Sequence, residues 1–66
     1  MMYTYYTFMR LAKESSSNEE LVEKVKKNGG TAFIRNGEVF SGVNDNFGYI
    51  AFSARLTANG FEVVMY

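Results

Sequence analysis

The last eighteen residues alternate between apolar and polar positions on both sides of an Asn-Gly pair. Asn59-Gly60 favours a tight hairpin, because a type I′ turn needs positive φ at both central residues. With this pair at the tip, Leu56 faces Val63 and one side of the ribbon is wholly apolar. The pattern therefore predicts a half-buried antiparallel hairpin over residues 49–66. The apolar side comprises Ile50, Phe52, Ala54, Leu56, Ala58, Phe61, Val63 and Met65.

A second Asn-Gly pair, Asn36-Gly37, lies inside residues 31–42 and predicts another hairpin. In the register that this pair sets, Arg35 faces Glu38. The pairs Ile34–Val39 and Phe33–Phe40 follow in the same register. Apolar groups therefore occur on both faces of this ribbon. That distribution indicates either a central position in the sheet or a second surface that a partner uses.

Residues 18–28 carry the signals of a helix. Ser17 and Glu20 have the spacing of a capping box. Glutamates gather in the first turn and lysines in the last, which complements the helix dipole. Gly29-Gly30 predicts a left-handed C-terminal cap. Only three apolar residues share one side, so this helix can cover part of a sheet but cannot form a core alone. They are Leu21, Val22 and Val25.

Residues 2–11 are rich in Tyr, Thr and Phe, which suit a pleated surface, and we predict a strand. A helix is the alternative. It would align four side chains on one face: Tyr5, Phe8, Met9 and Ala12.

The predicted fold is therefore a single α+β domain over residues 1–66. An N-terminal strand is followed by one helix (about 18–28) and an antiparallel meander of two Asn-Gly hairpins packed on that helix. The competing interpretation places a second helix at about 46–58, which would give a ferredoxin-like β-α-β-β-α-β order. That helix would align Phe47, Ile50, Ala51, Ala54 and Ala58.

Composition narrows the classes of function. Seven basic and seven acidic residues give a formal net charge of zero and a pI near 6.2. Proteins that bind nucleic acid through phosphate contacts are normally basic. No apolar run approaches the roughly 20 residues that span a bilayer, and the opening residues lack the marks of a signal peptide. We expect a cytoplasmic protein without a membrane partner.

The sequence contains no histidine and no cysteine. Their absence removes the usual general base, the thiol nucleophile and most metal ligands. Most carboxylates lie where a helix cap or an ion pair already explains them. We therefore expect no enzyme activity, no catalytic residue, no metal and no cofactor.

One motif indicates a different class of function. Residues 47–52 read Phe-Gly-Tyr-Ile-Ala-Phe, which resembles the core of the RNP1 motif of RNA-recognition-motif and cold-shock proteins. The resemblance implies that single-stranded RNA or DNA stacks on Phe47 and Tyr49. The basic residue and glycine that lead the motif are replaced here by Asp45 and Asn46, so a phosphate contact becomes a repulsion.

The polar side of the second hairpin is the expected binding face, with Phe47, Tyr49, Arg55 and Tyr66 as its residues. Aromatic residues beside an arginine are typical of protein–protein hot spots. We expect a small non-enzymatic interaction module, an inhibitor or modulator of a larger assembly of the phage or mobile-element accessory type. A protein is the expected partner and single-stranded nucleic acid is the alternative. A homodimer through an exposed strand edge is a further expectation.

Overall fold

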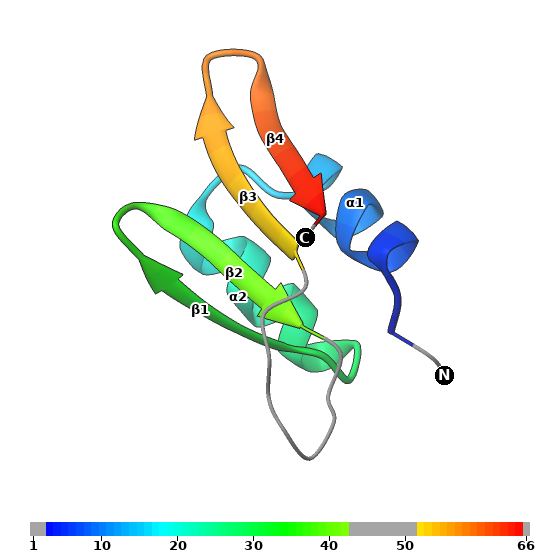
Figure 1. Ribbon diagram of the computed structural model, residues 1–66. Helices are drawn as coiled ribbons and strands as arrows, with labels where there is room; N and C mark the ends of the chain where they lie inside the picture. The colour runs from blue at the N-terminus through cyan, green and yellow to red at the C-terminus, as the bar shows by residue number, and fades with distance from the viewer. Residues whose placement is uncertain (1–2, 43–51, 66) are drawn as a thin grey trace.

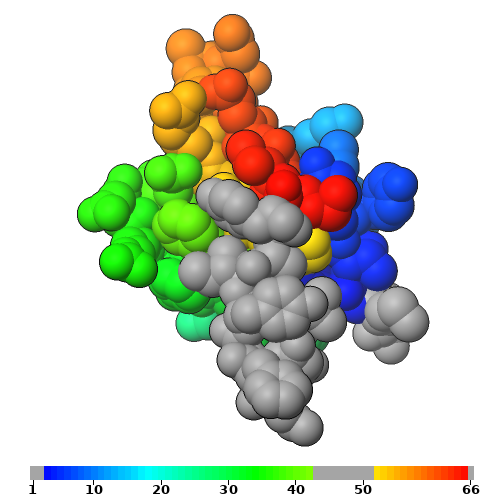
Figure 2. Space-filling model, viewed as in Figure 1, coloured from blue at the N-terminus to red at the C-terminus, as the bar shows by residue number. Residues whose placement is uncertain are grey.

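The computed structural model describes residues 3–42 and 52–65. Two helices, α1 (Tyr5–Lys13) and α2 (Asn18–Lys27), precede four strands. The strands are β1 (Thr31–Arg35), β2 (Glu38–Gly42), β3 (Phe52–Thr57) and β4 (Gly60–Met65). They form one antiparallel sheet in the order β1-β2-β3-β4, and the helices pack against one of its faces. Figures 1 and 2 look onto the other face. The predicted α+β meander of two hairpins is confirmed.

The N-terminal strand predicted over residues 2–11 is wrong, because α1 occupies this segment. Thr4 caps the helix: its hydroxyl accepts the backbone N–H of Thr7, and the Thr7 hydroxyl accepts the backbone N–H of Thr4 in return. Phe8 and Ala12 are buried one helical turn apart, as the helix alternative required. Tyr and Thr favour strands intrinsically, but the cap and the burial of one helical stripe outweigh that preference.

The predicted helix at 18–28 is confirmed as α2, with a small change in its cap. The Ser17 hydroxyl accepts the N–H of Glu20 at 3.1 Å. The Glu20 carboxylate, however, reaches past the cap residue and accepts the N–H of Ser16 at 2.7 Å. At the other end Gly29 has φ 87°, and the N–H of Gly30 bonds to the carbonyl of Val25. These bonds form a Schellman cap, which satisfies carbonyls that the helix end leaves free.

The first hairpin has the predicted register, with Arg35 opposite Glu38 and Phe33 opposite Phe40. Its tip is the expected Asn36-Gly37 pair, and both residues have positive φ, 53° and 79°. This is the backbone that a type I′ turn requires.

The second hairpin has the predicted faces but a different register. Leu56 faces Phe61, where the sequence pattern placed it opposite Val63. Thr57 explains the difference: its hydroxyl accepts the N–H of Asn59 at 3.2 Å and donates to the carbonyl of Gly60 at 2.7 Å. The turn therefore starts one residue earlier, and cross-strand partners move by two positions. A shift of two keeps every side chain on its face.

The ferredoxin-like alternative is wrong for the part of 46–58 that the structure describes. Residues 52–57 form β3, which pairs with β2 on one side and β4 on the other. The period-two alternation of Phe52 and Ala54 with Ser53 and Arg55 suits a strand paired on both edges. Residues 46–51 lie outside the described part of the chain.

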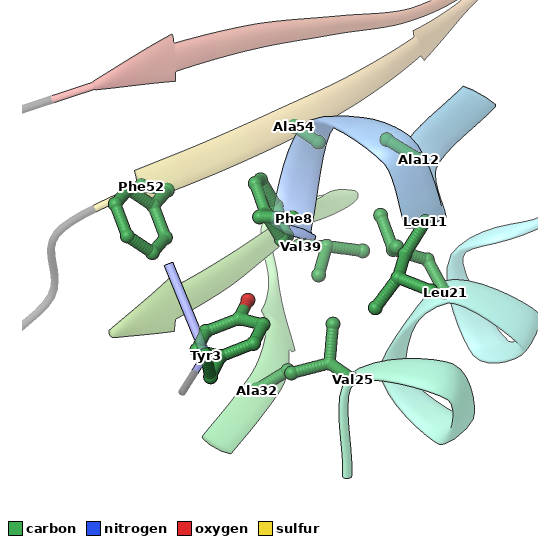
Figure 3. Close-up of a cluster of buried hydrophobic side chains, with 10 residues drawn as sticks. All are labelled: Tyr3, Phe8, Leu11, Ala12, Leu21, Val25, Ala32, Val39, Phe52 and Ala54. Atoms are coloured by element: carbon green, nitrogen blue, oxygen red, sulfur yellow. The ribbon is translucent and has the colours of Figure 1, made fainter. Parts of the chain in front are cut away.

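One core joins the helices to the sheet (Figure 3). The ring of Phe8 stacks on Phe52 with centroids 5.5 Å apart, and Tyr3 meets the same ring edge-on. The buried residues are Tyr3, Phe8, Leu11, Ala12, Leu21, Val25, Ala32, Val39, Phe52 and Ala54. Aromatic pairs of this kind add to the area term, which helps a domain too small for a large core.

Tyr3 ties the start of the chain to the sheet. Its hydroxyl lies 2.5 Å from Ser41 Oγ, and Ser41 donates its own proton to the carbonyl of Thr31. The Tyr3 ring lies directly against Gly30, where an added Cβ would come within 2.7 Å of ring carbons. Burial raises the pKa of the Tyr3 hydroxyl to about 12, a rise that the bond to Ser41 only partly offsets.

The two helices do not cover their whole side of the sheet. Leu56 and Met65 lie on the apolar side of the second hairpin but are 41% and 58% exposed. Phe52 and Ala54, on the same side, are buried. The predicted side of the second hairpin does face the helices, but the helix that packs on it is α1, near Phe52, whereas the predicted helix α2 packs mainly on β1 and β2.

Candidate interaction surface

The face of the sheet turned away from the helices, here called the outer face, is built from two rows of residues that run across all four strands. Cross-strand partners stand side by side, so the register fixes both rows. The first row is Phe33, Phe40, Ser53 and Val64. The second row is Arg35, Glu38, Arg55 and Glu62.

The first row is apolar apart from Ser53. Phe33 is 46% exposed and Val64 is 51% exposed, although both are strand residues. Phe33 and Phe40 stack with centroids 5.7 Å apart, and Phe40 is only partly exposed. Ser53, which stands between Phe40 and Val64 in the row, is buried, so this position of the outer face is closed to solvent. Within residues 3–42 and 52–65, neither helix packs on this row.

The second row alternates in charge from strand to strand. Arg55 and Glu62 form an ion pair of 3.1 Å between exposed side chains. Arg35 stands opposite Glu38, and Glu38 stands opposite Arg55. Opposite charges on adjacent strands stabilise a sheet by a fraction of about 1 kcal/mol for each pair, and such exposed pairs contribute little more. The row therefore presents four formal charges that sum to zero.

Of the four predicted site residues, the structure describes Arg55 alone. It lies on the outer face, on the side of β3 that the sequence pattern assigned to it. Phe47, Tyr49 and Tyr66 lie outside the described residues.

Sequence reasoning missed the aromatic pair Phe33 and Phe40 as site residues. The signal was present, because apolar groups on both faces of the first hairpin already indicated a second surface. What the pattern lacked was the order of the strands. Only the pairing of β2 with β3 brings Phe40 into line with Ser53 and places the arginines of different hairpins in one row.

A second surface feature lies on α1. An open groove of about 390 Å³ runs along the helix between Tyr6, Met9, Arg10, Lys13 and Glu14. Tyr6 is 79% exposed, and Arg10 forms an i,i+4 contact with Glu14 at 3.9 Å. The groove combines one aromatic ring with charges of both signs, and it has no buried polar group.

The carboxylate of Glu20 has a structural role at the start of α2. The pKa of Glu20 is lowered, first by the backbone N–H of Ser16 and then by Lys24. Glu20 and Lys24 lie 3.5 Å apart, and Glu23 and Lys27 lie 3.4 Å apart, the two i,i+4 pairs of α2. Among the described residues, no three acidic side chains gather as a metal site would require.

No helix in the described part of the chain has the length and apolar character needed to cross a membrane. No protein family model matches this chain, and no curated protein or solved structure matches it significantly.

Proposed function

We propose that this chain is a non-enzymatic protein-interaction module that binds a protein partner through the outer face of its sheet. The observation that carries the proposal is the pair of exposed apolar side chains Phe33 and Val64, on the side of the sheet that the helices leave open. A sheet that needs only one packed face would place polar residues there. The exposure of two large apolar side chains, Phe33 and Val64, on that side supports a second use for them.

The layout of the outer face matches the anatomy of protein interfaces. Such interfaces have an apolar, aromatic-rich centre and a polar rim, with arginine enriched. Here the apolar row lies beside the row of Arg35, Glu38, Arg55 and Glu62. The stacked pair Phe33–Phe40 would serve as the anchor and the charged row would set the orientation of the partner. A role as inhibitor or modulator of a larger assembly is the form of this function that we favour.

Charge favours a protein partner over single-stranded nucleic acid. Aromatic residues on an open sheet face are also where such nucleic acids stack their bases, but a positively charged groove then follows the phosphates. The row beside Phe33 and Phe40 instead holds two glutamates with two arginines. Each glutamate would lie near the backbone of a stacked strand and repel it. The stacking on Phe47 and Tyr49 implied by the RNP1-like motif stays a prediction.

The proposal is tested with two double variants that differ only in the face they alter. Phe33→Thr with Val64→Thr removes the exposed apolar groups of the outer face. Ile34→Thr with Met65→Thr changes the next residue on each strand, which lies on the opposite face and is similarly exposed. Threonine keeps the strand propensity in all four places.

The measurement is quantitative capture of proteins from the native host by each purified variant. We expect a specific protein that the unaltered chain and the Ile34/Met65 variant both retain, with at least about tenfold less on the Phe33/Val64 variant, as loss of interface anchors predicts. Retention of that protein by the Phe33/Val64 variant would contradict the proposal. Recovery of nucleic acid alone would support the alternative function.

A further inference from the structure

The two edges of the sheet are protected to different degrees. Within residues 3–42 and 52–65, β1 and β4 each pair with another strand on one side only. Proteins usually guard such edges with a charge in the strand, a proline or a bulge. β4 carries Glu62 near its middle, whereas the one charge of β1 is Arg35 at its end. β1 pairs with β2 without a bulge, and its residues Phe33 and Ile34 are 46% and 41% exposed. Within the described chain, the edge of β1 is therefore open to a further strand.

The backbone of β1 offers two residues to such a strand. The carbonyl of Thr31 points toward β2, because it accepts the hydroxyl of Ser41 at 2.7 Å. Hydrogen-bonding groups alternate from side to side along a strand, so those of Ala32 and Ile34 point away from β2. The turn after Arg35 requires the same alternation, since the two residues that flank a type I′ turn bond to each other.

One flank of α2 lies on the same side of the molecule as this edge. α2 packs on β1 and β2, and α1 packs on β3 and β4 (Figure 1). Lys24 marks the flank of α2 that faces α1, because its ammonium group donates to the carbonyl of Glu14 at 2.7 Å. At 3.6 residues per turn, the helix side away from Lys24 carries Glu19, Val22 and Lys26, here called the edge stripe. Among the described residues, neither charged member of the edge stripe forms an ion pair.

The edge of β1 is complementary to a second copy of itself. A two-fold rotation about an axis normal to the sheet lays the two β1 strands side by side and antiparallel. The register that pairs all five residues places Phe33 opposite Phe33 of the second copy. Ala32 then lies opposite Ile34 of the second copy, and the two exchange a pair of backbone hydrogen bonds. The symmetry repeats this pair, which gives four bonds, and Arg35 lies opposite the uncharged Thr31.

The edge stripe is complementary to its own copy under the same rotation. The rotation turns α2 antiparallel to the second α2, so Glu19 faces Lys26 of the second copy and Val22 meets its counterpart. Acidic, apolar and basic positions thus meet basic, apolar and acidic ones. We infer that this chain forms an edge-to-edge homodimer in which the two β1 strands pair and the eight strands form one sheet.

One axis serves both layers of this contact. The side chain of Asn18 bonds to the carbonyl of Gly37 at 3.0 Å, so α2 starts beside the hairpin tip and runs antiparallel to β1. Val22 lies four residues, about 6 Å, along the helix from Asn18. Phe33 lies two residues, about 7 Å, along β1 from Arg35, the last residue before the tip. The centre of the edge stripe therefore lies over the centre of β1.

The spacing of the two helices also suits the contact. α2 packs on both strands of the first hairpin, so its axis lies over the space between them. With strands about 4.8 Å apart, the two copies of α2 then lie about 10 Å from each other. Packed helices have axes about 8–10 Å apart. The edge stripes can therefore touch while the β1 strands pair.

The edge of β4 lacks this second layer of complementarity. α1, which packs on β4, has no acidic residue in its first turn, and its last turn carries Arg10 and Lys13. Two antiparallel copies of α1 would therefore bring no opposite charges together at their ends. Charge thus selects β1 over β4 as the edge that meets a second copy.

The homodimer goes beyond the proposed function and does not depend on it. Strand addition at an edge leaves both faces of a sheet uncovered, so the outer face stays open to another protein. Main-chain hydrogen bonds give such contacts most of their affinity. With four of them and two exposed ion pairs, we expect the dimer to form between about 10 μM and about 1 mM.

The first experiment blocks the edge without disturbing the sheet. Ile34→Pro removes an outward N–H, and edge strands accept proline at such positions. Ile34→Thr is the matched control, because it removes the same apolar side chain and keeps the N–H. Sedimentation equilibrium measures the mass, and circular dichroism verifies the fold. We expect the unaltered chain and Ile34→Thr to reach twice the mass of 7.5 kDa, with dimerisation at least about tenfold weaker for Ile34→Pro.

The second experiment tests the edge stripe and does not depend on the proline variant folding. Glu19→Lys with Lys26→Glu inverts the stripe, which is again complementary to its own copy but opposes like charges on the unaltered chain. Native mass spectrometry of a mixture, with one chain isotope-labelled, counts the mixed dimers. Their share should fall from the statistical value of about one half to below about one fifth. The control, Glu23→Lys with Lys27→Glu, inverts an exposed ion pair of α2 outside the stripe and should mix statistically.

Any of four results would overturn the inference. The first is a monomer mass for the unaltered chain up to about 1 mM. The second is equal dimerisation of folded Ile34→Pro and Ile34→Thr. The third is statistical mixing of the unaltered chain with the inverted stripe. The fourth is a mass that keeps growing beyond the dimer, because β1 would then pair with β4 of the next copy in an open-ended series. None of them bears on the capture of a host protein by the outer face.

Discussion

The two hairpins carry the same Asn-Gly pair near their tips but turn in different ways. At the first tip, Asn36 and Gly37 both have positive φ, as a type I′ turn requires. At the second tip, Gly60 has φ 106° and Asn59 does not have positive φ; Asn36 is the one non-glycine residue of the described chain that does. The second tip is a turn closed by a glycine at the start of β4, with Thr57 bonding across it.

The residue before the turn accounts for the difference. Thr57 places a hydroxyl where it can accept the N–H of Asn59, and such a bond favours right-handed turn conformations. Arg35, at the corresponding position of the first hairpin, has no such group to offer. A contact with α2 also stabilises the first tip: the side-chain amide of Asn18 donates a hydrogen bond to the carbonyl of Gly37 at 3.0 Å. An Asn-Gly pair therefore predicts a hairpin reliably, whereas its neighbours decide the register.

The hairpins also differ in how deeply the helices bury them. Val39 and Ala32 of the first hairpin lie in the core, whereas no residue of β4 is buried and Val63 is only half-buried. Each row of the outer face nevertheless contains residues from both hairpins. The difference in burial leads to the predictions below.

The largest contrast is expected from shortening one valine in each hairpin. Val39→Ala removes two methyl groups from a fully buried site and should lower the free energy of unfolding by about 2.5 kcal/mol. Val63→Ala should cost less than about 1 kcal/mol, because its site is open enough to admit water. Urea denaturation followed by circular dichroism measures both. Equal losses would mean that the helices cover the two hairpins alike.

High pH should loosen the anchor at the base of the first hairpin. An unfolded tyrosine ionises near pH 10, whereas Tyr3 in the folded chain has a pKa of about 12. The folded state thus holds the proton more tightly, so the stability that Tyr3 contributes is complete below pH 10 and is lost as pH rises towards 12. The loss should be about 2 kcal/mol.

Tyr3→Phe serves as the control for this pH effect. Its unfolding free energy should be lower at neutral pH by about 1 kcal/mol, for the lost bond to Ser41. It should also lack the additional fall between pH 10 and 12. An unchanged pH slope in this variant would assign the effect to other groups.

The two asparagines should respond differently to alanine. Asn36→Ala forces alanine into a left-handed conformation and should cost about 1 kcal/mol. Asn59→Ala should cost almost nothing, because Asn59 has ordinary backbone angles. Thermal melting of both variants under the same conditions measures the two losses of stability. A larger loss at Asn59 would show that the second tip is a type I′ turn after all.

The smallest effect is expected at Thr57. Thr57→Val removes the hydroxyl that bridges the turn and should cost about 0.5 kcal/mol, as an exposed hydrogen bond does. Thr57→Ser keeps the hydroxyl and should keep the pairing of Leu56 with Phe61. Cross-strand nuclear Overhauser contacts report that pairing directly. Loss of the pairing in the serine variant would show that the Thr57 hydroxyl does not set the register.

Much of the fold could be predicted because its signals are local. The cap at Ser17, the glycines after α2 and the Asn-Gly tips each act within a few residues. The N-terminal strand was predicted wrongly because Tyr and Thr favour strands only when no stronger contact decides. Here Phe8 packs on Phe52, a contact between residues far apart in sequence, and it selects the helix.

The candidate surface could be predicted only in part, for a related reason. Period-two patterns place Arg55 on the outer face correctly, because the alternation within a single strand decides which face a side chain occupies. Aligning Phe33 and Phe40 with Val64 requires the order of all four strands, which no single segment encodes. The charge order of the second row becomes visible only after this alignment.

The central claim is that the outer face, and not the half-covered side toward the helices, meets a protein partner. Side-chain NMR of the labelled chain, recorded while the host protein that it captures is added, reports which face the partner contacts. The methyl signals of Val64 and the ring signals of Phe33 and Phe40 should shift together as the partner is added, while those of Ile34 and Leu56 stay fixed. Movement of Ile34 and Leu56 with a stationary Val64 would contradict the claim.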